Sequence, residues 1–300
     1  MSDQPTTSGT LDFRDWTTWY RVTGELPGAR TPLVTLHGGP GASHDYLLSL
    51  TDLATGGRAV VHYDQLGCGR STHLPERGGD FWSVELFLDE LDNLLERLGL
   101  AEGYHLLGQS WGGMLAAEHA VRRPAGLRSL VISNSPASMA LWSEAADALR
   151  AQLPDGVRET LKRHEAAGTY DDPEYLAATE AYYDRHVCRV RPYPAEVQHS
   201  FDQMGEDPTV YHTMNGPNEF YCVGTLRDWS IVERAALIDV PTLLVSGRHD
   251  EATPLVVQPF FDAIPDVRWE VFDESSHMPF VEERALYMEV VGAFLAEHDH

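Results

Sequence analysis

Short, continuous apolar runs recur along the chain, and each one ends in a glycine-rich or polar turn. Runs of this length between turn signals indicate strands that are buried on both faces of a parallel sheet. The predicted buried strands are residues 33–36, 59–63, 104–107, 130–132, 241–245 and 268–272. A segment rich in Thr, Trp and Tyr, residues 12–22, suits edge strands.

Helical spacing fills several of the stretches between these strands. Leucines recur at helical spacing, at positions 86, 88, 91, 94, 95 and 98, with acidic residues between them, and this pattern predicts an amphipathic helix. Further helices are expected at residues 111–121 and, at the end of the chain, at 282–297. Alternating strands and helices predict an α/β fold in which helices cover both faces of a mainly parallel central sheet.

The alternation is interrupted in the middle of the chain. Between about residues 139 and 230 there are helical stretches, Pro and Gly breaks and many aromatic residues, but no clear buried strand. We interpret residues 139–230 as a helical cap inserted into a single domain. The core then consists of residues 1–138 and 231–300.

Composition narrows the possible functions. The 300 residues are 43% hydrophobic, which is enough to bury a sizeable core. The formal net charge is −24, and so acidic a surface repels phosphate backbones and anionic lipids. We therefore expect no nucleic-acid partner and no membrane partner. Nothing in the sequence specifies an oligomeric state.

The cellular location and metal content can also be predicted from simple patterns. No apolar run approaches the length of about 18 residues that a membrane span needs. The first ten residues are polar and lack a secretion signal pattern, so a cytoplasmic location is expected. The three cysteines are widely spaced and form no CxxC motif, which argues against a disulfide framework and against a zinc site.

A serine lies at the turn between the predicted strand 104–107 and the helix that begins near residue 111. The local sequence is Gly108-Gln109-Ser110-Trp111-Gly112, with the spacing G-x-S-x-G. Between a strand and a helix, this spacing is typical of a nucleophile elbow, a tight and strained turn that exposes a serine hydroxyl. The helix N-terminus behind the turn favours developing negative charge. Ser110 is therefore the candidate nucleophile.

A serine nucleophile needs a general base, and the base needs an acid that orients it. In folds with such an elbow the chain order is serine, acid and histidine, each on a loop after a strand. Asp250 follows the predicted strand 241–245, and His277 follows the predicted strand 268–272. The loop after strand 130–132 carries no carboxylate, so Asp250 is the predicted acid and His277 the predicted base.

Acyl transfer also requires donors for the negative oxygen of the tetrahedral intermediate. One donor is expected to be the backbone N–H of Trp111, directly after the nucleophile. The second should come from the loop after strand 33–36, which reads His37-Gly38-Gly39-Pro40-Gly41. Glycines let a backbone approach a ligand closely, and we assign the second donor to Gly39.

Three motifs together resemble the proline iminopeptidase (prolyl aminopeptidase) family of α/β-hydrolases. They are the loop 37–41, the segment Asp64-Gln65-Leu66-Gly67-Cys68-Gly69-Arg70-Ser71, and the elbow with the following Gly113. The resemblance covers residues 12–297 and extends into the cap, where residues 215–220 (NGPNEF) are similar to the tricorn-associated aminopeptidases of this family. It implies the α/β-hydrolase fold with an inserted cap. It also implies removal of the N-terminal residue, often proline, from peptides without a metal or cofactor.

The same resemblance implies a site for the free amine of the substrate. In that branch of the family, two glutamates bind the α-ammonium group, and the matching positions here are Glu219 and Glu251. This role is physically reasonable, because an α-amino group is largely cationic at neutral pH and a half-buried cation needs opposite charge nearby. The implied substrate is a small peptide or an aminoacyl amide.

Three other functions remain open from the sequence. The protein could be an amidase that removes an aminoacyl group from a non-peptide biosynthetic intermediate. It could be a carboxylesterase or thioesterase, for which Glu219 and Glu251 would be idle. From a different class, it could be a pseudo-hydrolase that only binds a ligand beneath the cap, although the complete set of Ser110, Asp250 and His277 argues against that.

Overall fold

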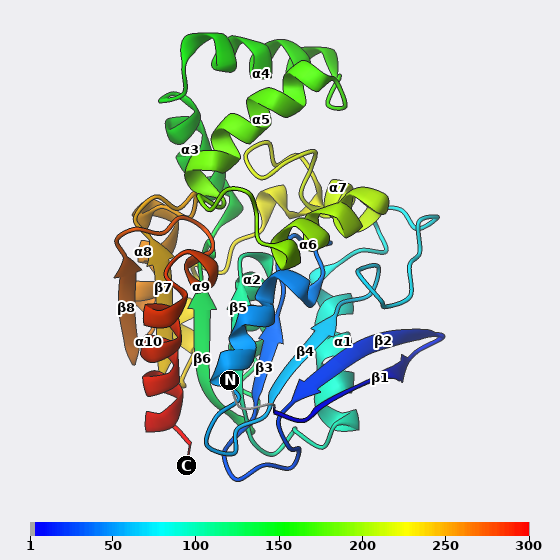
Figure 1. Ribbon diagram of the computed structural model, residues 1–300, viewed down its shortest axis with the longest axis vertical. Coiled ribbons are helices and arrows are strands. Elements are labelled where there is room, and N and C mark those ends of the chain that lie inside the picture. Colours follow the sequence, from blue (N-terminus) through cyan, green and yellow to red (C-terminus); the bar gives the residue numbers. More distant parts are fainter. Residues whose placement is uncertain (1–3, 300) are drawn as a thin grey trace.

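Eight strands form one sheet that runs through the core of the protein (Figure 1). The structure is a computed structural model that describes residues 4–299. The strands are β1 (Thr6–Phe13), β2 (Trp16–Thr23), β3 (Leu33–Leu36), β4 (Val60–Asp64), β5 (Tyr104–Gln109), β6 (Leu127–Ser133), β7 (Thr242–Gly247) and β8 (Val267–Phe272). Their order across the sheet is β1-β2-β4-β3-β5-β6-β7-β8.

From β4 to β8 in the sheet order, all neighbouring strands pair parallel. β1 pairs antiparallel with β2, and β2 pairs antiparallel with β4. The mainly parallel sheet is confirmed. Residues 12–22 contain the end of β1 and most of β2, but only β1 lies at the edge of the sheet, because β2 pairs with both β1 and β4. All the predicted strands form, although β8 is the opposite edge strand and is mostly exposed rather than buried. Parallel strands place their C-terminal ends at the same edge of the sheet, so the loops after β3, β5, β7 and β8 meet there.

Residues on neighbouring positions of the central strands pack on opposite faces of the sheet. Leu106 belongs to one cluster of buried hydrophobic side chains, and Leu107 belongs to the other. Leu130 and Val131 alternate in the same way. Since both faces are buried, these strands read as continuous apolar runs rather than as alternating patterns.

Helices cover both faces, as predicted. The helices α1 (Val84–Arg97), α2 (Trp111–Ala120) and α8 (Pro254–Ala263) contribute to the first cluster. The second cluster is covered by α10 (Arg284–Glu297) and by η1 (His44–Leu53), a 3₁₀ helix that the hydrophobic pattern did not predict.

The end of the chain differs from the single helix expected at residues 282–297. A short helix, α9 (Pro279–Glu282), comes first, and α10 begins only at Arg284. The break lies at Glu283, whose backbone angles, φ −123° and ψ 46°, are not helical, and the side chains of Glu282 and Glu283 bond back to the preceding loop. Glu282 accepts the N–H of Ser276 at 2.7 Å, and Glu283 accepts the N–H of Glu274 at 3.0 Å. These bonds fix the loop that precedes α9.

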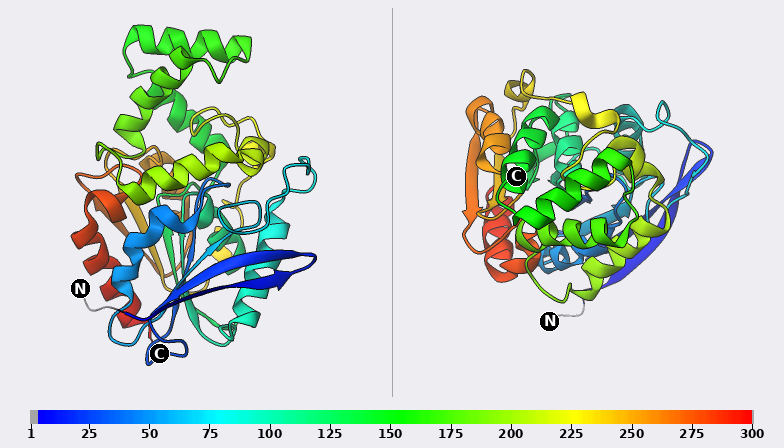
Figure 2. Two further views of the ribbon diagram at one scale, coloured as in Figure 1. Left: turned by 45° about the vertical axis from the view of Figure 1, so that its right-hand side comes forward. Right: turned by 90° about the horizontal axis from the view of Figure 1, so that it is seen from above.

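The five helices of the middle segment lie beyond the C-terminal edge of the sheet (Figures 1 and 2). They are α3 (Met139–Arg150), α4 (Asp155–Ala167), α5 (Pro173–His186), α6 (Ala195–Glu206) and α7 (Thr209–Met214). A short 3₁₀ turn, η2 (Thr225–Asp228), follows them, and another, η3 (Ala235–Leu237), leads back to β7. A single bridge pairs Ser138 with Ser230. We propose that this bridge marks the limits of the cap, whose boundaries at 139 and 230 stay a prediction.

Helix α6 connects the cap to the core (Figure 2). The hydroxyl of Ser200 on α6 accepts the backbone N–H of Ser43 at 3.1 Å, and the two hydroxyl oxygens are 3.2 Å apart. Ser43 directly precedes η1. Among residues 4–299, no helix is both long and apolar enough to cross a membrane.

The loop after β4 is held by a buried carboxyl group. Glu90 on α1 is fully buried, accepts the N–H of Leu66 at 3.0 Å and accepts the hydroxyl of Thr18 at 2.5 Å. Burial raises the pKa of Glu90 to about 7, from an ordinary 4.5. The folded protein therefore holds a proton on Glu90 more tightly than the unfolded chain does.

Replacing this carboxyl group should change how stability depends on pH. Below about pH 4.5, Glu90 is protonated in both the folded and the unfolded protein and does not lower the unfolding free energy. Because the folded pKa is the higher one, Glu90 destabilises the folded protein increasingly up to about pH 7 and fully above it. We expect the unfolding free energy of Glu90→Gln, relative to wild type, to rise between pH 5 and 8 by up to roughly 3 kcal/mol. Denaturant unfolding at several pH values measures this difference, and a pH-independent difference would contradict the assignment.

Candidate active site

Ser110 lies on the turn between β5 and α2, with φ 55° and ψ −123°. A positive φ is strained for any residue other than glycine. The turn closes because its flanking glycines lack side chains. A Cβ on Gly108 would lie 2.0 Å from the carbonyl oxygen of Gly112, and one on Gly112 would lie 2.1 Å from that of Leu36. The predicted nucleophile elbow is therefore present in the backbone.

The structure brings the predicted acid and base together. Nδ1 of His277 lies 2.7 Å from Oδ1 of Asp250, and both residues are buried. Burial alone would lower the pKa of His277, but the Asp250 carboxylate outweighs it and the net pKa is raised. His277 and Ser110 line the same cavity.

Asp250 is held by donors that the sequence did not suggest. Its Oδ2 accepts the side-chain amide of Asn134 at 2.6 Å, and its Oδ1 accepts the N–H of Ala252 at 2.8 Å. Asn134 follows β6 in the left-handed region, with φ 53°. It lies in the loop after β6, where the sequence has no carboxylate. That missing carboxylate is the only feature of the sequence that draws attention to this loop. Asn134 fixes the carboxylate of Asp250 in place.

The predicted oxyanion loop packs directly against the nucleophile. A Cβ on Gly38 would lie 3.0 Å from Cβ of Ser110. The N–H of Gly38 is already used, since it donates to the hydroxyl of Tyr46 at 2.7 Å. Gly39 has φ 106°. Within residues 4–299, neither the Gly39 N–H nor the Trp111 N–H donates a hydrogen bond, so both remain available to a ligand.

Glu219 and Glu251 lie in the same buried region as His277. Glu251 is 1% exposed, and Oε1 of Glu251 lies 3.9 Å from Nε2 of His277. Glu219 lies between α7 and η2, and its Oε1 accepts the hydroxyl of Tyr211 at 2.7 Å. Burial raises the pKa of both carboxyl groups, and repulsion by Glu219 and Asp250 raises that of Glu251 further.

In the described part of the chain no hydrogen bond of standard geometry reaches either carboxylate oxygen of Glu251, although the neighbouring hydroxyl of Tyr182 stabilises the carboxylate and lowers its pKa. A buried, unpaired carboxylate is costly, because nothing replaces the water that it loses. This arrangement suits a site whose partner is supplied by a ligand. That ligand must bring a cation or several N–H donors.

Two cavities flank the nucleophile and share Gly39, Ser110 and Glu219 as lining residues. The first is otherwise mainly apolar and is lined from the cap by Val197, Ser200, Phe201 and Met204. The second is lined by Trp142 and by the apolar side chains of Met114, Met139 and Leu226. A substrate bound at Ser110 therefore has an apolar space on each side of the reacting carbonyl.

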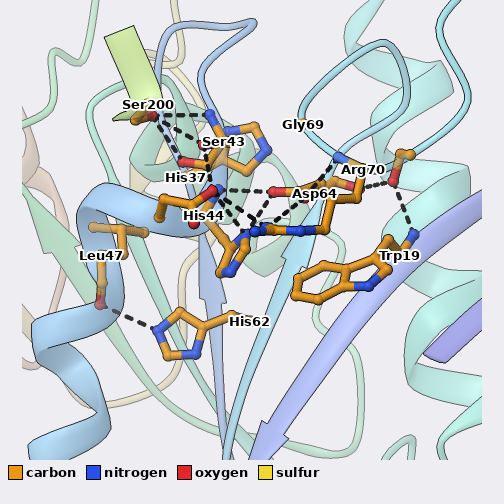
Figure 3. A network of polar contacts seen from close by, with 12 residues as sticks. Trp19, His37, Ser43, His44, Leu47, His62, Asp64, Gly69, Arg70 and Ser200 are labelled. Atoms are coloured by element: carbon orange, nitrogen blue, oxygen red, sulfur yellow. Dashed lines mark hydrogen bonds and ion pairs between the residues drawn. The ribbon is translucent and has the colours of Figure 1, made fainter. Parts of the chain in front are cut away.

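A separate cluster has side chains that could ligate a metal ion. His44, Asp45 and Asp64 are buried, with Nδ1 of His44 at 2.8 Å from Oδ1 of Asp64 (Figure 3). The guanidinium of Arg70 lies 3.3 Å from Asp45 and 3.9 Å from Asp64. The cationic position beside the two carboxylates is thus taken by Arg70. A second possible group, His164, Asp172 and Glu174, is partly exposed, and Arg163 pairs with Glu174.

Comparisons with known proteins identify the family to which the chain belongs. Residues 31–284 match the family described as having the alpha/beta hydrolase fold. A proline iminopeptidase of Lactobacillus delbrueckii subsp. lactis is 40% identical over 291 residues, covering 96% of this chain and 98% of that protein.

Two crystal structures are similar over almost their whole length. The structure of VinJ is 57% identical with a TM-score of 0.96, covering 97% of this chain and 99% of VinJ. The structure of a proline iminopeptidase from Mycobacterium smegmatis is 54% identical with a TM-score of 0.90, covering 98% of this chain and 99% of that one.

The pairing of His277 with Asp250 predicts a reactive serine with a defined pH dependence. Labelling of Ser110 by a fluorophosphonate requires neutral His277 as base. Because the pKa of His277 is raised, the labelling rate should fall as pH drops through a midpoint above the ordinary value of about 6.5. Ser110→Ala should not be labelled. His249→Ala removes an exposed neighbouring histidine and should behave as wild type. A midpoint at or below about 6.5 would contradict the assignment.

Proposed function

The chain belongs to the proline iminopeptidase family of α/β-hydrolases, and from this membership we propose that it is a serine aminopeptidase. It hydrolyses the amide bond after an N-terminal proline or small apolar residue that has a free α-amine. The observation that carries this proposal is the pair of glutamates beside the nucleophile, of which Glu251 is buried and Glu219 half-buried. Glu251 in particular has no arginine or lysine partner and no hydrogen bond of standard geometry within the described residues.

The glutamates select a substrate with a free amine. An α-ammonium group and a carboxylate together hold the same number of protons as a neutral amine and a carboxylic acid. The raised pKa of Glu251 therefore does not prevent binding, since the proton can move onto the incoming amine, whose own pKa is about 8. A prolyl nitrogen in its cationic form has two N–H bonds, one for each of Glu219 and Glu251. An acylated prolyl nitrogen carries no charge and no N–H.

Bond cleavage follows the roles proposed for the triad. Oγ of Ser110 attacks the carbonyl carbon while Nε2 of His277 takes the hydroxyl proton. Asp250 orients the imidazole and stabilises its charged form. The backbone N–H groups of Gly39 and Trp111 hold the negative oxygen of the tetrahedral intermediate.

The intermediate then collapses into products. The C–N bond breaks as His277 gives its proton to the leaving amine, and an aminoacyl ester remains on Ser110. A water molecule next attacks this ester while His277 takes one of its protons. Ser110 recovers its proton when the free amino acid leaves.

The two cavities suggest where each half of the substrate binds. The cavity lined by Trp142, Met114 and Leu226 is the proposed place for the side chain of the N-terminal residue. The cavity lined by Phe201 and Met204 then takes the leaving group. Small peptides are the proposed substrates, and the cytoplasm stays the predicted location.

A second candidate function is favoured by the apolar lining of the leaving-group cavity. Val187, Val197, Phe201, Met204 and Met278 surround it. Such a surface suits an apolar amine at least as well as a peptide. The alternative is therefore an amidase that removes an aminoacyl group from a non-peptide amine, with the same catalytic residues.

Removing either acidic charge should weaken catalysis only for free-amine substrates. For Glu251→Gln and Glu219→Gln we expect kcat/KM on prolyl p-nitroanilide to fall at least about 30-fold, since losing one partner of a buried charge pair costs upward of about 2 kcal/mol. Hydrolysis of p-nitrophenyl acetate, which has no amine, should be unchanged. Glu270→Gln is the matched control, because Glu270 is exposed on β8. Equal losses on both substrates, or no loss on the anilide, would contradict the proposal.

The choice between the two functions depends on the leaving group. If peptides are the substrates, kcat/KM for prolyl-glycine amides should equal or exceed that for prolyl amides of a medium-chain alkylamine. If the second candidate is right, the alkylamide is preferred, and Phe201→Ser should remove that preference by exposing a polar group in the cavity. N-acetylated versions of both substrates serve as controls and should not be cleaved.

A further inference from the structure

Gln65 lies between the two segments that carry the proposed oxyanion donors. It directly follows β4 and is fully buried. Its side-chain Nε2 donates to the carbonyl oxygen of His37 at 2.9 Å, and its Oε1 accepts the indole N–H of Trp111 at 2.8 Å. One amide group thus joins the loop after β3 to the first residue of α2.

The orientation of this amide is fixed by its partners. A carbonyl oxygen can only accept, and an indole N–H can only donate, so the nitrogen of Gln65 must face His37 and its oxygen must face Trp111. A third bond strengthens the contact, since the backbone N–H of Gln65 donates to Nε2 of His37 at 3.0 Å. Burial lowers the pKa of His37 to about 4, so the ring is neutral at pH 7 and Nε2 remains an acceptor.

We propose that Gln65 is a positioning residue that sets the spacing between the N–H groups of Gly39 and Trp111. Gly39 is two residues from His37, which the amide holds, and the other proposed donor belongs to Trp111 itself. This inference rests on the oxyanion roles given under the proposed function. Gln65 acts through these two segments and has no contact with the reacting atoms.

The far side of the same loop is held independently. Tyr46 accepts the N–H of Gly38 at 2.7 Å and donates to Oε1 of Gln109 at 2.5 Å. Nε2 of Gln109 in turn donates to the carbonyl oxygen of His277 at 3.1 Å. The Tyr46 contacts tie the loop to the histidine, whereas Gln65 ties it to Trp111. Losing Gln65 should therefore loosen the oxyanion donors without dismantling the triad.

A defect of this kind has a kinetic signature. Oxyanion donors act on the charge that develops in the transition state, so displacing them lowers kcat and leaves KM nearly unchanged. Loss of one complete donor costs about 100- to 1000-fold in kcat. Both donors remain present in a Gln65 variant but are less well placed, and we expect a loss of about 10- to 100-fold.

Three variants and one control test this proposal with prolyl p-nitroanilide. Gln65→Leu removes both side-chain bonds, Gln65→Glu keeps an acceptor for Trp111 but faces His37 with a second acceptor, and Trp111→Phe removes only the indole donor. Thr35→Val is the control, because it removes one buried hydrogen bond, from Thr35 to the carbonyl of Val61 at 3.1 Å, in the strand that leads to the same loop. The control should keep the wild-type kcat.

A transition-state mimic supplies a readout that a general loss of stability would not change. The tetrahedral adduct of proline boronic acid with Ser110 places a hydroxyl group in the oxyanion hole. In the Gln65 variants, its inhibition constant should rise in parallel with the fall in kcat/KM. Inhibition by pyrrolidine, which keeps the ring amine but has no oxygen, should stay unchanged.

The proposal is overturned if correctly folded Gln65 variants, with melting temperatures near that of Thr35→Val, keep kcat within about threefold of wild type. It is also overturned if the loss appears in KM alone. Should Gln65→Leu fail to fold, Gln65→Glu and Trp111→Phe decide the question.

Failure of the proposed function gives a different result from failure of the Gln65 role. If wild-type protein cleaves no free-amine anilide, the aminopeptidase proposal is wrong. The same variants are then compared on p-nitrophenyl acetate, whose hydrolysis by Ser110 needs the same oxyanion donors. A loss of about 10- to 100-fold on the ester still supports the positioning role, and unchanged ester hydrolysis overturns it.

Discussion

Close approach of backbone to backbone at the elbow is the constraint on which the rest of the site depends. The segments that end β3 and begin α2 meet at distances that leave no room for a Cβ on Gly112, and Gly108 is equally confined. This contact holds Ser110 in its strained conformation. It also places the oxyanion loop beside the serine and brings Trp111 within reach of Gln65. The geometry of catalysis therefore follows from how tightly the sheet packs on one helix.

Asp250 and Glu251, two adjacent acidic residues near Ser110, differ in how well their charges are compensated. Asp250 accepts several hydrogen bonds and pairs with His277, so its charge is well compensated. Glu251 lies one residue further along the chain and accepts no hydrogen bond of standard geometry within the described residues, although the Tyr182 hydroxyl lies beside it. Two adjacent carboxyl groups thus differ in character: one pairs with the imidazole, and we propose that a substrate amine completes the other. A surface with a net charge of −24 adds a field that attracts cationic ligands toward this site.

The sequence was informative where local patterns determine structure. Apolar runs located the buried strands, and the ends of those strands located Ser110, Asp250 and His277 before any contact was known. The glutamates were different, because in the sequence Glu219 and Glu251 are two acidic residues among many, and only the family resemblance singled them out. Contacts between distant segments outside the recognised motifs could not be predicted. Asn134, Tyr46 and the partners of Gln65 act across the sheet edge, and no periodicity or spacing marks them.

The bridge between Ser138 and Ser230 brings the two ends of the inserted segment together. The polypeptide therefore leaves the catalytic body and returns to it at one place, so the path of the sheet does not depend on what lies between. Helices α3 and α6, which supply part of the walls of the two cavities, are therefore encoded in one continuous stretch of the sequence. The elbow and the loops after β7 and β8, with Glu251 among them, are encoded outside it.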